Sequence, residues 1–99
     1  MGMKVADMID VFNASTAFSY ASRHRFPNNI LNGSWNAQAR IYNPWKDVGL
    51  AVRLAHECGA DIELGERTFA FLEKAVARGM AEEDYSLLYR DFEEIKKTR

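Results

Sequence analysis

Helical periodicity without any strand pattern is the feature that most constrains this chain. Residues 5–13 place Val5, Met8, Ile9 and Phe12 at i, i+3, i+4 and i+7, which is one stripe of a helix. No run of alternating apolar and polar residues, bounded by turn residues, occurs among the 99 residues. The pattern therefore predicts an all-α fold.

Start and stop signals predict where the later helices lie. Asn43 followed by Pro44 is typical of a helix start, with Asn as the N-cap and Pro at the first helical position. We expect that helix to reach Cys58 and to end at Gly59. A second helix is expected from about residue 64 to 78, with Gly79 after it. A third is expected to begin near residue 83 and to carry apolar residues at helical spacing as far as residue 95. Its acidic start and the two lysines at its end match the helix dipole.

The segment before Asn43 is less regular. We expect a short helix over residues 18–24, which Phe26 and Pro27 should end because the residue before a proline avoids the α region. Residues 28–43 then read as a turn and an irregular segment. Taken together, the elements predict a bundle of about five helices in a single domain over residues 1–99.

Composition excludes several classes of protein. Cys58 is the single cysteine, so no internal disulfide or thiolate-rich zinc site can form, and we expect it to be buried on an apolar helix face. No apolar run approaches the ~18 residues of a membrane span, and the first residues do not resemble a signal peptide. The six glycines form neither a dinucleotide fingerprint nor a phosphate-binding loop. We expect a soluble cytoplasmic protein without a membrane partner.

Charge is balanced overall but unevenly placed. The chain has 13 basic and 14 acidic residues, yet no acidic residue lies between Asp10 and Asp47. Arginines and aromatic side chains are interleaved in that stretch, so it could meet an anion. The alternative is the edge of a core with solvated basic side chains, and composition does not decide between the two.

The remaining polar candidates are Lys46 with Asp47 and the two histidines. Lys46 and Asp47 lie in the first turn of the helix that begins at Asn43, where the dipole favours Asp and disfavours Lys. The lysine could therefore reach from the helix start to an anionic or carbonyl ligand. His24 lies between two arginines, and His56 has no partner at helical metal-ligand spacing. No metal site is predicted.

Four blocks of sequence, in order and at matching spacing, resemble the β-hydroxyacid dehydrogenase family, which includes 3-hydroxyisobutyrate dehydrogenase and tartronate semialdehyde reductase and is related to 6-phosphogluconate dehydrogenase. The first block corresponds to the family's N-A-S-[ST] run with R-[FL]-P after it. The second corresponds to K-D-L-x-L-A, the third to A-x-x-x-G, and the fourth to R-G-x-G-x-x-D-[FY]-S. In this chain the blocks are residues 13–27, 46–51, 55–59 and 78–86.

The resemblance implies an all-α domain that, in these enzymes, follows a Rossmann domain and a long connecting helix. The family's G-x-G-x-x-x-K-x-x-x-N motif, which carries the catalytic lysine, does not occur in the 99 residues. The resemblance therefore implies no catalytic residue here, and no tight binding of NAD or NADP by this chain alone. Lys46 matches the family lysine that reaches the nicotinamide end of the cofactor, and Asp47 matches a substrate-side acid.

The partners implied by the resemblance are a Rossmann domain of the same enzyme, a second copy in a homodimer, and a small hydroxyacid. A different class of function is also open: a non-catalytic helical module that dimerises or docks a partner through its apolar faces. Nucleic-acid binding through Arg23, Arg25 and Arg40 is disfavoured by the acidic second half of the chain, so no nucleic-acid partner is predicted.

Overall fold

The computed structural model describes residues 2–99, and the chain divides into two compact units, Met1–Ala37 and Gln38–Arg99. Helices account for 63% of the structure and none of the described residues forms a strand, which confirms the predicted all-α fold. The expectation of a single domain over residues 1–99 stays a prediction. No helix among residues 2–99 is long and apolar enough to cross a bilayer.

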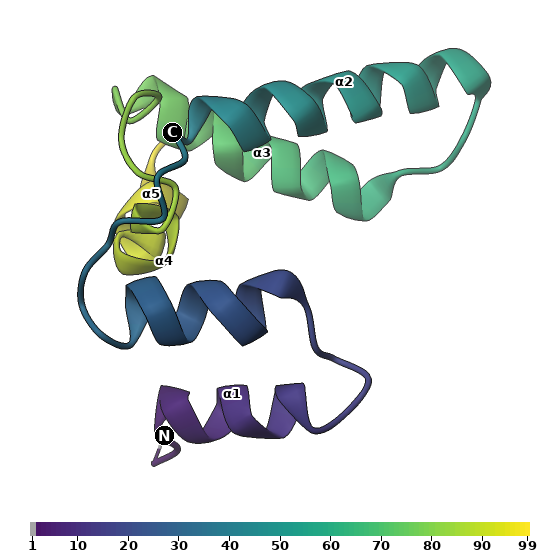
Figure 1. Cartoon of the computed structure of the whole chain (residues 1–99). Helices are drawn as coiled ribbons and strands as arrows, with labels where there is room; N and C mark the ends of the chain where they lie inside the picture. Colours follow the sequence, from purple (N-terminus) through teal and green to yellow (C-terminus); the bar gives the residue numbers. More distant parts are fainter. Residues whose placement is uncertain (1) are drawn as a thin grey trace. The chain divides into compact units, whose positions relative to one another are not determined.

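The first unit consists of two helices packed against each other (Figure 1). Helix α1, Val5–Asn13, has the bounds that its apolar stripe predicts, and Ile9 is the residue of that stripe that is buried. Its partner is a π-helix, η1, which spans Ala21–Ile30. A π-helix carries hydrogen bonds between residues five apart, as in the bond from the Leu31 N–H to the Phe26 carbonyl (2.7 Å).

Helix η1 corrects the prediction that Pro27 ends the local helix. Proline has no N–H, so in the i→i+5 pattern the carbonyl of Ser22 loses its partner. The side-chain amide of Asn13, at the end of α1, donates to this carbonyl (3.0 Å). The side-chain amide oxygen of Asn13 in turn accepts a hydrogen bond from the buried Ser22 hydroxyl (2.7 Å). A contact nine residues away therefore compensates for the proline, and the helix continues through it.

We expect Asn13→Asp to destabilise the first unit by about 1–3 kcal/mol, because the Ser22 carbonyl loses its donor and then faces a carboxylate oxygen. Hydrogen exchange at the amides of η1 measures the effect directly. Asn28→Asp, an exposed substitution of the same kind on η1, is the matched control. Equal exchange rates in the two variants would show that Asn13 does not support η1.

The second unit is built on an antiparallel pair of helices, α2 (Tyr42–Cys58) and α3 (Glu63–Ala77) (Figure 1). Both end as predicted, at Gly59 and Gly79, whose φ values of 72° and 84° lie in the left-handed region. After each helix the chain closes two backbone bonds typical of a Schellman motif. In α2 these run from Gly59 to His56 (3.2 Å) and from Ala60 to Ala55 (2.9 Å).

Close contact between α2 and α3 depends on a glycine. A Cβ atom built at Gly49 would lie 2.8 Å from the ring of Phe69 on α3, so a larger residue would force the ring to move. Near the far end of the pair, His56 on α2 and Glu66 on α3 are hydrogen-bonded at 2.6 Å. Cys58, predicted to be buried, is exposed. The buried side of α2 is centred on Val52 instead.

The core of the second unit lies where α3 meets the start of α2 and the last helix. Its members are buried to at least 96% and come from four separate places in the sequence: Ile41, Ala75, Met80 and Ile95. Backbone bonds fix the segment before α2 against the segment after α3, from Ile41 to the Glu83 carbonyl and from Tyr85 to the Ala39 carbonyl (2.9 and 2.8 Å). These bonds position the first residues of α2.

The single helix predicted over residues 83–95 is wrong in its start and its continuity. The structure has two short helices instead, α4 (Leu87–Arg90) and α5 (Phe92–Lys97). The Asp84 carboxylate accepts bonds from the Ser86 N–H (3.0 Å) and the Ser86 hydroxyl (2.5 Å) through one oxygen. Its other oxygen accepts from the Gln38 N–H (3.0 Å). This turn around Asp84 delays the helix until Leu87.

The junction between α4 and α5 carries a carboxyl group with a lowered pKa, that of Asp91. Arg90 holds Asp91 through two parallel bonds, 2.8 and 3.0 Å long. The hydrogen bond from Arg90 lowers the pKa of Asp91 below its ordinary value of 3.8, more than burial raises it. A lowered pKa in the folded state adds stability above the unfolded pKa, and this stability is lost as the pH falls through the folded pKa.

We therefore expect Asp91→Asn to lower the thermal midpoint at pH 7 by a few degrees at most, because the Arg90 side chain is about half exposed and solvent screens the pair. The difference from the unchanged chain should shrink as the pH falls below 3.8 and should disappear below the lowered pKa, where Asp91 in the folded chain is itself neutral. Calorimetry at pH 7 and at about pH 2 measures both values. Glu93→Gln, in the first turn of α5, should show no such convergence. A difference that persists at the acidic pH would assign the effect to packing rather than charge.

Candidate functional site

Lys46 and Asp47 lie on α2, one turn beyond its first residue. The helix begins at Tyr42, whose N–H is bonded to the Ala81 carbonyl (2.9 Å). Asn43, predicted to be the N-cap, is inside the helix, and no side chain caps its start. Pro44 fits there because the first N–H groups of a helix lack internal partners. The helix dipole therefore acts less strongly on Lys46 than predicted.

The two side chains are exposed and close to each other. The Lys46 ammonium lies 3.6 Å from the Asp47 carboxylate, and their side chains are 54% and 71% exposed. An exposed ion pair of this kind contributes little to stability, so neither residue is needed for folding. The lysine presents three donors to solvent and the aspartate two acceptor oxygens. Side by side, they can meet a carbonyl or phosphate oxygen and a hydroxyl group of one ligand.

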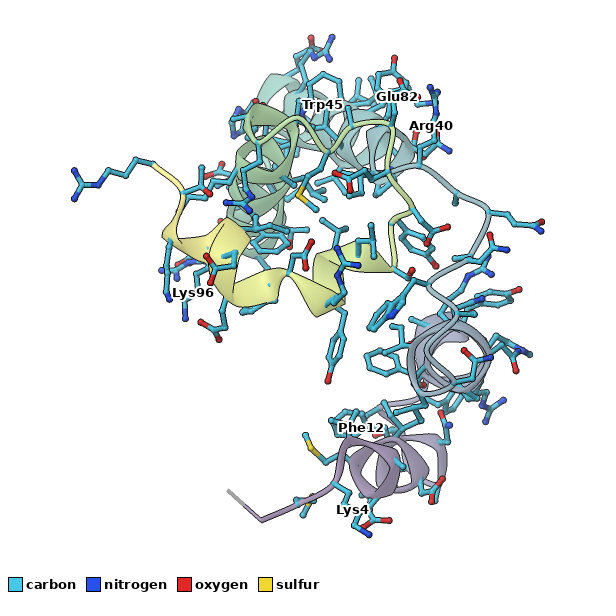
Figure 2. The ribbon with its side chains drawn as sticks, turned by 90° about the vertical axis from the view of Figure 1, so that its left-hand side faces the viewer. Lys4, Phe12, Arg40, Trp45, Glu82 and Lys96 are labelled. Atoms are coloured by element: carbon cyan, nitrogen blue, oxygen red, sulfur yellow. The ribbon has the colours of Figure 1, made fainter. Side chains whose placement is uncertain are left out.

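Residues just before Lys46 and Asp47 are held in place. Trp45 donates its indole N–H to the Glu73 carboxylate on α3 (3.2 Å), and its ring is 5.6 Å from that of Tyr42. Arg40 lies over the Tyr42 ring and forms an ion pair with Glu82 (2.7 Å) (Figure 2). The start of α2 is thus a rigid support, from which the two charged side chains project.

The basic and aromatic residues that could have bound nucleic acid are paired within the chain. In the first unit, Arg23 lies over the Phe18 ring at 3.9 Å and Arg25 over the Tyr20 ring at 5.1 Å. In the second unit, Glu82 neutralises Arg40. His24 lies against the Tyr20 ring with 4.5 Å between ring centroids. Among residues 2–99, no three His, Cys, Asp or Glu side chains are grouped as a metal ion would require.

One surface feature was missed by the sequence analysis. A groove between α3 and α5 is lined by aromatic rings and by cationic side chains from both helices. Its cationic residues are Arg67, Lys74 and Lys96, and no short motif links positions so far apart in the sequence. The only signal present was the helical spacing of Arg67, Phe71 and Lys74 on one side of α3.

A comparison with protein families shows which family the chain belongs to. The family described as "NAD-binding of NADP-dependent 3-hydroxyisobutyrate dehydrogenase" has a model that matches residues 1–92. The match covers α1, η1, α2, α3 and α4 in full. The chain belongs to this family. No curated protein and no solved structure matches the chain.

Membership in the 3-hydroxyisobutyrate dehydrogenase family gives structural meaning to two of the motifs. The asparagine of the N-A-S-T run is Asn13, which satisfies the carbonyl left free by Pro27. The aspartate of the final D-Y-S run is Asp84, which ties Ser86 to Gln38. Asn13 thus supports η1, and Asp84 stabilises the turn before α4. Lys46 and Asp47, by contrast, form no contact that the fold requires.

Proposed function

We propose that this chain is the helical domain of an NAD(P)-dependent β-hydroxyacid dehydrogenase, in which it shapes the substrate pocket and the dimer interface. The family match over residues 1–92 carries this proposal. The chain has no glycine-rich phosphate loop, so another domain must hold the phosphates of a dinucleotide. By itself the chain is inactive, because the 99 residues lack the family's catalytic lysine motif.

Lys46 and Asp47 carry the polar groups that a nicotinamide cofactor and a hydroxyacid would need at this position. Lys46 offers an ammonium with free donors, which can bind the carboxamide oxygen or a phosphate oxygen. Asp47 offers acceptor oxygens to a hydroxyl group of the hydroxyacid. The cofactor, when bound, supplies the chemistry of hydride transfer. The chain itself holds the ligands in orientation and limits their access to water, with Lys46 and Asp47 as positioning groups on a rigid helix.

A fusion protein tests the proposal. The Rossmann domain and connecting helix of a family enzyme, joined ahead of Gly2, should give a protein that oxidises 3-hydroxyisobutyrate or a related β-hydroxyacid with NAD or NADP. Absorbance of the reduced nicotinamide measures the rate. The 99-residue chain alone should give none. A fusion that folds and binds the cofactor but turns over no β-hydroxyacid would contradict the proposal, and so would turnover by the chain alone.

A non-catalytic interaction module is the second candidate, and the exposed apolar residues of α2 favour it. Leu50 and Leu54 lie one turn apart and are each about half exposed. Adjacent apolar side chains on one helix face are typical of a surface that a partner covers. Sedimentation of the chain over a range of concentrations measures self-association, and the activity of the fusion separates the two functions. Self-association through this face, together with an inactive fusion, would support the module.

A further inference from the structure

The groove between α3 and α5 has the dimensions of a small-molecule site. Its volume is about 570 Å³, which is within the range of pockets that bind small ligands. Its floor is apolar: Phe71 and Phe92 lie with their ring centroids 5.0 Å apart, and Ala70 extends the floor along α3. Phe92 is 44% exposed, so water reaches one side of this aromatic pair. The groove is open and remains on the surface of the second unit.

The rim of the groove is cationic. Three of its lining residues, Arg67, Lys74 and Lys96, carry positive charge and none of its lining residues is acidic. Arg67 has an acidic neighbour on its own helix, Glu63, at 3.9 Å. Within residues 2–99, neither Lys74 nor Lys96 forms an ion pair. The excess of positive charge is therefore greatest at the end of the groove where α5 finishes.

The geometry of the two lysines concentrates donors at that end. Lys74 donates one hydrogen bond to the carbonyl of Lys96 (3.0 Å), which belongs to the last turn of α5. This bond stabilises the helix end, but it uses only one of the three N–H groups of the ammonium. The Lys96 ammonium lies 5.9 Å from the Phe92 ring centroid (Figure 2 labels Lys96). Unused donors thus border the exposed aromatic surface.

We propose that this groove binds a carboxylate that carries a hydrocarbon chain. The hydrocarbon lies on Phe71 and Phe92, where it removes apolar surface from water. The carboxylate accepts hydrogen bonds from Lys74 and Lys96, whose charges it complements. A bare phosphate would leave the aromatic floor uncovered, and an uncharged hydrocarbon would leave the lysines without a partner. The site is separate from Lys46 and Asp47 and does not depend on the dehydrogenase function.

A titration with sodium octanoate tests the proposal on the 99-residue chain. The amide signals of α3 and α5 should shift in a saturable way, as measured by NMR on isotopically labelled protein. 1-Octanol, which has the same chain length without the charge, should bind at least fivefold more weakly. Lys96→Gln should weaken octanoate binding roughly fivefold, the loss expected for one exposed ion pair. Lys97→Gln, on the same helix and outside the groove, is the matched control.

A second variant separates binding from folding. Phe92→Ala removes exposed ring surface from the floor and should weaken octanoate and octanol alike, with unchanged helix content. Equal affinity for octanoate and octanol would overturn the proposal, as would equal losses in Lys96→Gln and Lys97→Gln. Self-association that Phe92→Ala abolishes would show that a second copy occupies the groove instead. Tighter binding of an acidic amphipathic peptide than of octanoate would assign the groove to a protein partner.

Discussion

Ile95→Ala is expected to lower the free energy of unfolding of the second unit by about 2–5 kcal/mol. The Ile95 side chain is fully buried, and it packs in one cluster with Ile41, Ala75 and Met80. Helix α5 is a short helix, and isolated helices of this length do not persist in water, so its packing through Ile95 keeps it in place. Native domains of this size are stable by only about 5–15 kcal/mol. The substitution therefore removes a large share of the total.

Thermal unfolding followed by circular dichroism measures this effect as a fall of roughly 10 °C or more in the midpoint. Ile95→Val deletes one methyl group and should cost about 0.5–1.5 kcal/mol, which gives a graded series at one position. Leu54→Ala, an exposed site on α2, is the control and should change stability by no more than about 0.5 kcal/mol. If Ile95→Ala and Leu54→Ala melt at the same temperature, α5 is not part of the core.

Local signals predicted the parts of the fold that local physics determines. The bounds of α1 follow from its apolar stripe, and the ends of α2 and α3 follow from Gly59 and Gly79. These signals depend only on residues a few positions apart, so tertiary contacts elsewhere in the chain do not change them. The all-α class follows in the same way, because it needs only the period of the apolar residues.

The wrong predictions have causes that lie elsewhere in the chain. Pro27 does not end its helix, because Asn13 supplies the donor that the Ser22 carbonyl lacks. The helix predicted from residue 83 begins later, because the Asp84 side chain is engaged by Gln38 as well as by its own turn. Each correction depends on a tertiary contact over nine or more residues. Single-sequence signals carry no information about such a contact.

The same distinction between local and tertiary signals applies to the functional sites. Lys46 and Asp47 were found through a motif, since they are adjacent and follow a helix start. The groove between α3 and α5 was not, because folding alone brings Lys74 and Lys96 together. Sequence reasoning thus finds a site whose residues share one helix. A site assembled from two helices needs the structure.

Lys46→Met, made in the fusion protein, is expected to lower kcat/KM roughly 10- to 100-fold. The estimate follows from the loss of one charged hydrogen bond, worth about 1.5–3 kcal/mol at a ligand. Methionine keeps the length of the side chain and removes the ammonium. Because Lys46 is exposed and its ion pair with Asp47 contributes little to stability, the variant should melt at the same temperature as the unchanged fusion. A loss of rate without a loss of stability would identify a functional group.

The two kinetic constants separate the possible roles of the lysine. If Lys46 binds the cofactor equally in the ground state and the transition state, KM for the cofactor rises while kcat is unchanged. If it orients the nicotinamide for transfer, kcat falls as well. Asp47→Asn should act on KM for the hydroxyacid, since its proposed partner is the substrate. Arg53→Met removes another exposed charge from the same side of α2, two turns further along, and serves as the control. Identical kinetics for Lys46→Met and Arg53→Met would mean that Lys46 takes no part in the reaction, whatever the activity of the fusion.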